Sequence, residues 1–288
     1  MASIIEVKNL SYTYDGDAQI VKDAIHDISF SIEKGEIVGI IGHTGSGKST
    51  LIQHLNGLLK PASGEVLLNG KNIWDDPKNI KDIRFKVGLV FQYPEYQLFE
   101  ETVFADIAFG PKNMGLTGDE LKNRVESICD TVGIKREYFD KSPFDLSGGE
   151  KRRVAIAGVM AMKPEVLILD EPIAGLDPKG RHEVSAMVKN YREKFGATVI
   201  IVSHNMEDMA SLADKLIVLS GGKLVMYDTA YNVFSKGDML SEIGLSVPVV
   251  TKVLKLINEK NNDIRTDIFT LKDAVEYLCA LSAGGKNA

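Results

Sequence analysis

A glycine-rich stretch at residues 42–49 has the clearest chemical meaning in this chain; it reads Gly-His-Thr-Gly-Ser-Gly-Lys-Ser. Its glycines permit backbone conformations that side chains forbid, so that successive N–H groups can point inward and hold phosphate oxygens. The Lys48 ammonium would reach the β- and γ-phosphates of a nucleotide, and the Ser49 hydroxyl would be a ligand of Mg²⁺. We therefore interpret the stretch as a site for a nucleoside triphosphate and not as a turn that matches by chance.

The segments on either side of this stretch support that interpretation. The apolar run 37–41 before it predicts a buried parallel strand, and a helix with one apolar face is predicted after it. That face consists of Leu51, Ile52, Leu55 and Leu58. A helix that begins near Lys48 aims the positive end of its dipole at the same phosphates. The residues expected to contact the nucleotide here are Gly42, His43, Thr44, Gly45, Ser46, Gly47, Lys48, Ser49 and Thr50.

Two adjacent carboxylates, Asp170 and Glu171, follow the apolar residues 166–169. Taken alone, this pattern is equally a buried strand that ends at a solvated turn. Beside the phosphate loop, we expect a parallel strand next to strand 37–41 that brings Asp170 to the Mg²⁺ ion, usually through water. Glu171 would stand at the carboxyl end of that strand, where ligands of open α/β sheets bind, and could polarise the attacking water.

The segment Leu-Ser-Gly-Gly-Glu at 146–150 predicts a second phosphate-binding surface. Ser147 and Glu150 have the spacing of a capping box at the start of a helix that runs through Met162. Free N–H groups, a serine hydroxyl and the small residues Gly148 and Gly149 would let an anion approach that helix start closely. Taken alone, the segment would more simply be the start of a well-capped helix.

Sheet and helix signals divide the chain into a core, an insertion and a tail. Strands are predicted at about 5–14, 28–32, 37–41, 166–170, 198–203, 216–219 and 223–227, the last two as a hairpin. Helices are predicted at 103–109, 117–132 and 147–162, so a helical insertion at about 95–162 interrupts the sheet-rich core. From about residue 236 a tail with two amphipathic helices follows. Their apolar residues are Val249, Val250, Val253, Leu254 and Ile257, and then Leu271, Ala274, Val275 and Leu278.

The composition excludes several classes of protein. The 288 residues carry 34 lysines and arginines against 40 acidic residues, a net charge of −6, which argues against nucleic acid as a partner. The two cysteines, Cys129 and Cys279, lie far apart and have no metal-ligand spacing, so a reducing compartment is the simplest reading and neither receives a role. The N-terminus lacks the pattern of a signal peptide, and no stretch approaches the length of a membrane span. At a membrane, the chain would act as a peripheral subunit.

Taken together and in order, these motifs resemble those of the ATP-binding cassette (ABC) superfamily of transport ATPases. The ordered set is residues 42–49, Gln92 after Val-Phe, residues 146–150, Asp170-Glu171, residues 174–177 (Ala-Gly-Leu-Asp) and His204 after Val-Ser. The resemblance covers roughly residues 4–230. It implies an α/β P-loop NTPase fold: a RecA-like core with an antiparallel β subdomain, a helical ABC subdomain and a short C-terminal helical tail. The implied domains are an ABC ATPase domain at 1–235 and a helical dimerisation segment at 236–288.

The resemblance also implies roles for single residues in ATP hydrolysis with Mg²⁺. Gln92 would contact the metal or water and report the nucleotide state to a membrane partner. His204 would touch the γ-phosphate and hold the active geometry with Glu171, and Asp177 would lie at a dimer interface. The implied catalytic residues are Glu171, His204, Gln92 and Lys48, and the implied metal ligands are Ser49, Gln92 and Asp170.

An aromatic residue near the N-terminus would stack on the adenine ring. Tyr14 matches that position best and Tyr12 is the alternative. Taken alone, either tyrosine would more simply be packed in the core, and His204 would more simply be a satisfied histidine at the end of a strand.

Cassettes of this superfamily bind ATP between their own P-loop and the Ser-Gly-Gly helix start of a second cassette, here Ser147, Gly148 and Gly149. One chain would therefore carry two half-sites and no complete site. Hydrolysis would require a dimer.

Finer resemblance points to the ATPase subunits of energy-coupling-factor (ECF) transporters, the CbiO-like group, and within it to the second of two paralogous subunits. The similar segments are 42–45, 53–59, 91–99, 152–158 and the tail helices. The resemblance implies a peripheral protein on the cytoplasmic side of the cell membrane. Its partners would be a second ABC ATPase subunit, an integral membrane scaffold subunit and a substrate-capture subunit. It would energise import of a micronutrient, a vitamin or a transition-metal ion.

A cluster of apolar and aromatic residues could form part of a groove for a scaffold helix. These residues are Tyr93, Tyr96, Leu98, Phe99, Val103 and Phe104. The alternative, that they fill the core of the helical insertion, is expected to hold for about half of them.

Three other functions compete with this interpretation. The ATPase of a conventional importer is disfavoured by residues 91–99 and by the short tail. A soluble cassette that acts as a switch on nucleic acid or the ribosome usually has two cassettes or long coiled coils, which this chain lacks. A P-loop kinase leaves residues 146–150 unexplained. The sequence names neither the cargo, which another subunit would read, nor a homodimer over a heterodimer.

Overall fold

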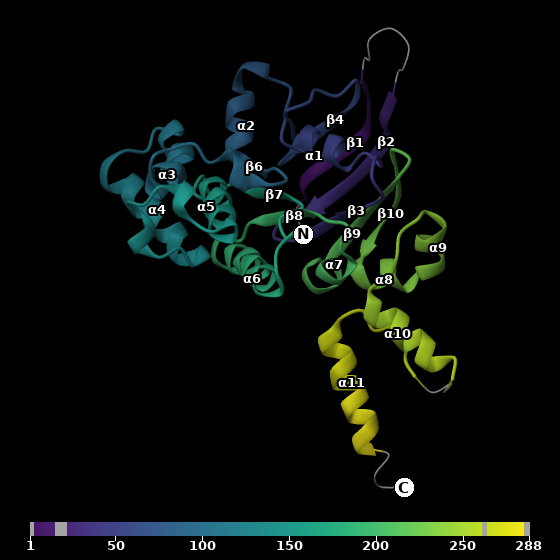
Figure 1. Ribbon diagram of the computed structural model, residues 1–288. Helices are drawn as coiled ribbons and strands as arrows, with labels where there is room; N and C mark the ends of the chain where they lie inside the picture. Colours follow the sequence, from purple (N-terminus) through teal and green to yellow (C-terminus); the bar gives the residue numbers. More distant parts are fainter. Residues whose placement is uncertain (1–2, 15–21, 261–263, 285–288) are drawn as a thin grey trace.

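A central six-stranded sheet forms the core of the chain (Figure 1). The computed structural model describes residues 3–14, 22–260 and 264–284. Along the sheet the strand order is β10 (Lys223–Thr229), β9 (Lys215–Ser220), β3 (Ile37–Ile41), β8 (Thr198–Val202), β7 (Val166–Asp170) and β6 (Val87–Val90). All neighbours pair in parallel except β9 and β10, which form the predicted hairpin. Every residue of β3 and β8 is buried, as expected for central parallel strands covered on both faces.

One prediction about this sheet is wrong. We expected the strand that ends at Asp170 to lie next to β3, but β8 lies between β3 and β7. The apolar run of β7 identifies a buried strand without specifying its neighbours, and the five buried residues of β8 fill the central position. Because the three strands are parallel, their carboxyl ends still meet at one edge of the sheet.

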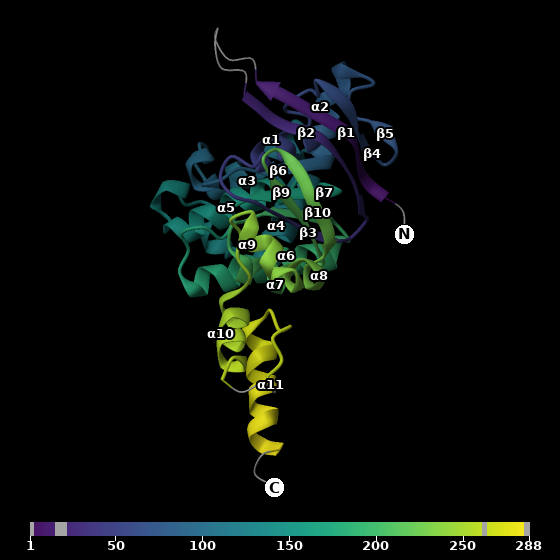
Figure 2. The ribbon, with the colours of Figure 1, turned by 90° about the vertical axis from the view of Figure 1, so that its right-hand side faces the viewer.

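A second, antiparallel sheet lies against the first on one side (Figure 2). Its strand order is β2 (Lys22–Glu33), β1 (Ser3–Tyr14), β4 (Ser63–Leu68) and β5 (Lys71–Asn72). Ile28, Phe30 and Ile32 on β2 are buried and alternate with exposed residues, which confirms the predicted period of two. Apolar residues of both sheets and of α1 (Lys48–Leu55) form one buried cluster, so α1 packs on both sheets at once.

The predicted helix after the phosphate loop is correct in position but shorter than expected. Leu51, Ile52 and Leu55 are buried in α1. Leu58 lies beyond the end of the helix at Leu55 and is exposed, so its assignment to the apolar face is wrong. Gly57, two residues after the last residue of α1, has a positive φ of 70°, a conformation in which the helix cannot continue.

The helices predicted between the two groups of strands form a separate layer beside the sheet (Figure 1). They are α3 (Val103–Asn113), α4 (Gly118–Val132) and α5 (Gly148–Met160), and they pack on one another and on α6 (Pro178–Phe195). Sequence reasoning missed α6 and the short helices α2 (Ile80–Lys86), α7 (Met206–Leu212), α8 (Ala230–Ser235) and α9 (Gly237–Glu242). In α6 the buried residues Val184, Met187, Val188 and Tyr191 do have helical spacing, so its signal was present in the sequence. The other four helices have only six or seven residues each, too few to show a clear period.

The two predicted tail helices, α10 (Val249–Asn258) and α11 (Leu271–Gly284), extend away from the body beyond α7 and α8 (Figures 1 and 2). They pack on each other through a small cluster of Leu254, Ile268 and Ala274. Most of their other apolar side chains are exposed, namely Val249, Val253, Leu256, Leu271, Val275, Leu278 and Leu281. In the part of the chain that the structure describes, no helix combines the length and apolar character that a membrane span requires.

Candidate nucleotide site

The predicted phosphate loop connects β3 to α1, with the backbone that phosphate binding requires. Gly45 and Gly47 have φ angles of +81° and +98°, which side chains rarely adopt. A Cβ atom at Gly47 would also lie 2.7 Å from both the Ala24 carbonyl oxygen and the Ile25 side chain. The glycine at this position is therefore required by backbone conformation and by space together.

Lys48 is held at the mouth of the loop. Its Nζ atom donates hydrogen bonds to the carbonyl oxygens of Gly42 at 2.7 Å and of His43 at 3.0 Å. Burial lowers the pKa of Lys48, while the nearby carboxylates of Glu171 and Asp170 act in the opposite direction. The ammonium is thus a partly desolvated donor whose charge interacts strongly with any anion in the loop.

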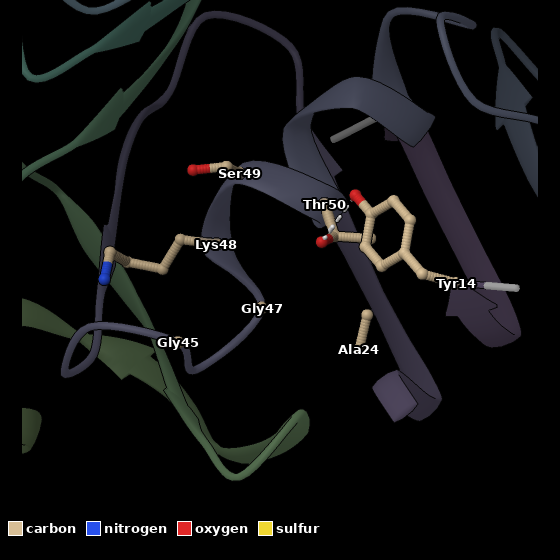
Figure 3. Close-up of a pocket in the computed structure, with 7 residues that line it drawn as sticks. All are labelled: Tyr14, Ala24, Gly45, Gly47, Lys48, Ser49 and Thr50. Atoms are coloured by element: carbon tan, nitrogen blue, oxygen red, sulfur yellow. Dashed lines mark hydrogen bonds between the residues drawn. The ribbon is translucent and has the colours of Figure 1, made fainter. Parts of the chain in front are cut away.

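One cavity opens on the tyrosine side of the loop (Figure 3). Its volume is about 290 Å³, and it is lined by Tyr14, Ala24, Gly45, Gly47, Lys48, Ser49 and Thr50. The Tyr14 hydroxyl lies 3.2 Å from Thr50 Oγ1, and the Tyr14 side chain is exposed. Tyr12 instead packs behind it, with its ring edge-on to Tyr14 and to the buried His54. Of the two tyrosines, Tyr14 is the one that borders the cavity.

A second cavity of about 740 Å³ lies on the other side of the loop and is lined by all four predicted catalytic residues. Its lining includes Gly42, His43, Thr44, Gly45, Lys48, Ser49, Gln92, Asp170, Glu171 and His204. These residues follow β3, β6, β7 and β8, whose carboxyl ends share one edge of the sheet. Ser46 lines neither cavity: its side chain is fully buried.

The same cavity has lining residues that sequence reasoning missed. Met206 is the first residue of α7, two residues after His204. Gly244, Leu245 and Ser246 come from the loop between α9 and α10. On the tyrosine side, Ala24 was also missed. None of these positions carries a motif, because what places them at the site is contact between distant parts of the chain.

Glu171 and His204 form a hydrogen-bonded pair. His204 Nδ1 lies 2.8 Å from Glu171 Oε1, and the Glu171 side chain is largely buried while His204 is exposed. Glu171 has a φ of +50°, an uncommon value for a residue with a side chain, and its N–H donates to the Val202 carbonyl oxygen at 2.9 Å. A left-handed backbone held in this way is typical of positions where function determines the conformation.

Asp170, at the end of β7, has a strongly perturbed carboxyl group. Burial raises its pKa to about 6, the neighbouring Glu171 charge adds to the increase, and Lys48 opposes it. A carboxylate whose charge is this costly gains from a cation placed beside it.

The residues of the predicted second phosphate-binding surface lie at the start of α5. The Ser147 N–H donates to Glu150 Oε2 at 2.9 Å, and the two residues make the predicted capping box. No atom lies within 4 Å of a Cβ built on Gly148 or Gly149, so this helix start is open to an approaching group. A cavity of about 420 Å³ here is lined by Ser147, Gly149, Glu150, Arg153, Leu176 and Asp177, among others.

This surface shares no lining residue with either cavity of the phosphate loop. Asp177 belongs to it as the N-cap of α6, where its Oδ1 accepts a hydrogen bond from the Gly180 N–H at 2.8 Å. A single chain therefore presents two separate candidate surfaces for an anion.

The residues that could hold a divalent cation lie in the larger cavity. Among the described residues, no group of three or more His, Cys, Asp or Glu side chains is arranged as a metal site. Mg²⁺, however, is usually bound by one or two carboxylates together with substrate phosphates and water. The Ser49 hydroxyl, the Asp170 carboxyl and the Gln92 amide fit such a set, since all three line this cavity with the phosphate loop.

Comparisons with known proteins agree with this geometry. The family described as "ABC transporter" matches residues 25–174. The "Energy-coupling factor transporter ATP-binding protein EcfA2" of Caldanaerobacter subterraneus subsp. tengcongensis is 53% identical over 98% of this chain and 99% of its own length. The protein of the same name from Clostridioides difficile is 53% identical over 97% of this chain and 98% of its own.

Two kinds of solved structure share the fold. The structure of cbiO1 from Clostridium perfringens, described as part of the ABC transporter complex cbiONQ, has a TM-score of 0.75 and 38% identity and covers 84% of this chain and 95% of its own. An ATP-binding cassette solved as a dimer in a post-hydrolysis state with ADP and Pi has a TM-score of 0.70 and 28% identity, over 79% of this chain and 99% of its own.

The raised pKa of Asp170 predicts a dependence of stability on pH in the nucleotide-free chain. Between the ordinary pKa of 3.8 and about 6, the native state keeps a proton that the unfolded state has lost, so the free energy of unfolding falls as pH rises through this window. Asp170→Asn removes that cost. The melting temperature of Asp170→Asn minus that of the wild type should therefore increase from acidic to neutral pH. The same difference for Asp140→Asn, at an exposed position, should show no such trend. A constant difference between Asp170→Asn and wild type across the window would contradict the prediction.

Proposed function

We propose a function from the premise that this chain belongs to the ABC transporter family and, within it, to the ATP-binding proteins of energy-coupling factor transporters. As a member of that family it is an ATPase. The function proposed is to energise the import of a micronutrient, a vitamin or a transition-metal ion, through such a transporter. The observation that carries the proposal is the pair of separate surfaces, one built on the phosphate loop and one on Ser147–Gly149, which together have the chemistry of one ATP site.

In the proposed complex, the loop between β3 and α1 binds the triphosphate of ATP. Backbone N–H groups and the dipole of α1 act on the phosphate oxygens, and Lys48 supplies the positive charge. Tyr14 provides a flat, exposed ring beside the loop on which adenine can stack. We expect Mg²⁺, which neutralises charge on the β- and γ-phosphates, to be held by Ser49 and by Asp170 and Gln92, the latter two directly or through water.

Hydrolysis would begin at Glu171. Its carboxylate accepts a proton from the attacking water while the water oxygen bonds to the γ-phosphorus. The bond between the γ-phosphorus and the bridging oxygen of the β-phosphate breaks at the same time. His204 holds one carboxylate oxygen of Glu171 by the 2.8 Å hydrogen bond and can reach the γ-phosphate with its other ring nitrogen. The histidine thereby fixes the direction in which the base faces the water.

Completion of the site requires a second cassette. The Ser147 helix start is open at Gly148 and Gly149, and its cavity shares no lining residue with those of the phosphate loop, so we expect it to contact a nucleotide on a partner. A solved cassette with this fold is a dimer, which supports the arrangement. The partner would be a second copy or a paralogous ATPase subunit.

The tail would contribute to the same dimer. Val249, Val253 and Leu256 on α10 are exposed, and so are Leu271 and Val275 on α11. Exposed apolar side chains gathered on two paired helices are typical of a surface that another protein covers. We therefore assign residues 236–288 to dimerisation, with residues 1–235 as the ATPase domain and a helical subdomain at about 95–162.

A membrane scaffold would dock on the helical subdomain. Tyr93, just before this subdomain, and Tyr96 and Phe99 within it are exposed, at 46%, 84% and 58%, and could contact a scaffold helix. Leu98 and Val103 are buried and Phe104 packs against the core, so these three belong to the subdomain interior. A cavity of about 410 Å³ lined by Phe85, Leu98, Phe99, Phe109 and Val159, among others, adjoins the exposed residues. Through this contact the chain would sit as a peripheral subunit on the cytoplasmic face of the membrane, beside a separate substrate-capture subunit.

If Tyr14 stacks on adenine, Tyr14→Ala should weaken ATP binding. Stacking of a base on an aromatic side chain contributes about 1–3 kcal/mol, which corresponds to about 5- to 150-fold in the dissociation constant. Tyr14→Phe keeps the ring and should bind ATP within a few-fold of the wild type in a fluorescence titration. Tyr96→Ala removes a tyrosine far more exposed than Tyr14 and away from the loop, and serves as the control. Unchanged affinity of Tyr14→Ala would show that the ring does not stack on the base.

Glu171→Gln should retain ATP binding and lose nearly all turnover. The amide keeps the size and hydrogen bonds of the side chain but cannot accept the proton, and general-base catalysis contributes about 10²- to 10⁴-fold. Phosphate release and nucleotide binding are measured on the same preparation, with Glu193→Gln on the exposed face of α6 as control. Near-normal hydrolysis by Glu171→Gln would refute the assignment of the base.

Because the site is shared, activity per molecule should fall on dilution as dimers dissociate. The decline should follow the loss of dimer measured at the same concentrations by light scattering. Constant specific activity from a chain shown to be monomeric would contradict the shared site.

A further inference from the structure

The larger nucleotide cavity has a wall that comes from the tail. Gly244, Leu245 and Ser246, between α9 and α10, line the cavity together with Glu171 and His204. We propose that this segment, the tail wall, senses the nucleotide and that Glu207 couples it to His204, so that the position of the tail regulates ATP turnover on its own chain. The inference rests on the proposed function and adds a means of regulation to it.

The tail wall is a defined structure. Gly244 has a φ of +74° and its N–H donates to the Ser241 carbonyl oxygen at 3.0 Å, while the Leu245 N–H donates to the Leu240 carbonyl oxygen at 2.8 Å. These two bonds and the left-handed glycine end α9 in a Schellman motif. Leu245 and Val247 then pack against the main core. The segment is therefore anchored on both sides of the residues that face the cavity.

Glu207 connects this segment to the catalytic histidine. Its Oε1 accepts a hydrogen bond from the Val249 N–H at 2.8 Å, at the first turn of α10. Glu207 lies in the first turn of α7, whose N-cap is Asn205, directly after His204. A negative charge at the start of α10 also interacts favourably with the helix dipole. The bond thus joins the segment that carries His204 to the segment that follows the tail wall.

The link continues into the rest of the tail. Thr251 is buried, and its Oγ1 donates to the Ile268 carbonyl oxygen at 2.7 Å, which ties α10 to the residues just before α11. The exposed apolar faces of α10 and α11 are thereby connected, through Glu207, to one edge of the catalytic cavity. A protein that binds the tail and favours one position of α10 would favour one position of His204.

Coupling of this kind works in both directions. If the position of the tail alters nucleotide affinity, a bound nucleotide must alter the tail equilibrium by the same free energy. An effect of the tail on the geometry of His204 changes kcat and need not be reciprocal. Typical couplings of this kind change an equilibrium about 5- to 150-fold. Hydrolysis would then be delayed until α10 and α11 are bound in the correct position on the partner subunit.

The first experiment tests whether the tail wall contacts the nucleotide. In a full-length Cys279→Ser chain, Ser246→Cys supplies a thiol at the cavity and Ser235→Cys supplies an exposed thiol on α8, outside the cavity. Cys129 is buried, and burial raises the pKa of its thiol to about 12, so it should not react with a charged thiol reagent. Mg²⁺ and ATP should slow modification at position 246 about fivefold or more and leave position 235 unchanged.

The second experiment tests the coupling through Glu207. Glu207→Leu removes the acceptor for the Val249 N–H, whereas Glu207→Gln retains an oxygen that can accept it. We expect Glu207→Leu to lower kcat about fivefold or more with little change in KM for ATP, and Glu207→Gln to restore most of it. Glu259→Leu, at the exposed end of α10, is the matched control and should behave as the wild type. Hydrogen exchange at 249–258 should respond to ATP in the wild type and not in Glu207→Leu.

The outcomes separate this inference from the proposed function. Normal ATP binding without protection at position 246, or a kcat for Glu207→Leu equal to that of the wild type, would overturn the inference and leave the proposed function intact. Equal losses in Glu207→Leu and Glu207→Gln would show that the charge matters and not the bond to Val249, which also overturns it. Failure of the wild-type chain to bind ATP at all would overturn both.

Discussion

The parallel pairing of β3, β8 and β7 is the constraint on which the site depends. Parallel strands buried on both faces place all their carboxyl ends at one edge, and the phosphate loop, Asp170 and Glu171, and His204 each follow one of these strands. The apolar side chains of these strands are buried in the two main core clusters, and their burial stabilises the sheet that positions the site. Most members of the site leave the sheet at this edge, whereas Asp170, the last residue of β7, remains partly buried.

At that edge, two features of the site are energetically unfavourable when considered alone. Glu171 has a left-handed backbone, and the Asp170 carboxyl has a pKa raised to about 6 by burial and by its neighbour. The surrounding structure maintains both features. The backbone of Glu171 accompanies a side chain that lines the cavity, and the raised pKa of Asp170 would make a nearby cation favourable. Strongly perturbed pKa values of this kind cluster at functional sites.

The separation of the two candidate anion-binding surfaces is the structural basis of the proposed pairing of two chains. The start of α5 is positioned by the helical layer, whereas the phosphate loop is positioned by the sheets, and the two surfaces share no lining residue. ATP between two chains would then join surfaces that one chain cannot bring together. The tail, with exposed apolar faces on α10 and α11 and a wall in the catalytic cavity, lies where pairing and chemistry can affect each other.

Local chemistry was readable from the sequence and long-range packing was not. The phosphate loop, the Ser147 capping box and the Asp170-Glu171 pair depend on residues adjacent in the chain, because glycine conformation, helix capping and strand ends are set within a few residues. The strand order that puts β8 beside β3, the exposure of Leu58 and the choice of Tyr14 over Tyr12 at the cavity were decided by tertiary structure. So was the approach of Gly244–Ser246 to Glu171, since contacts between residues distant in sequence leave no pattern in the order of the amino acids.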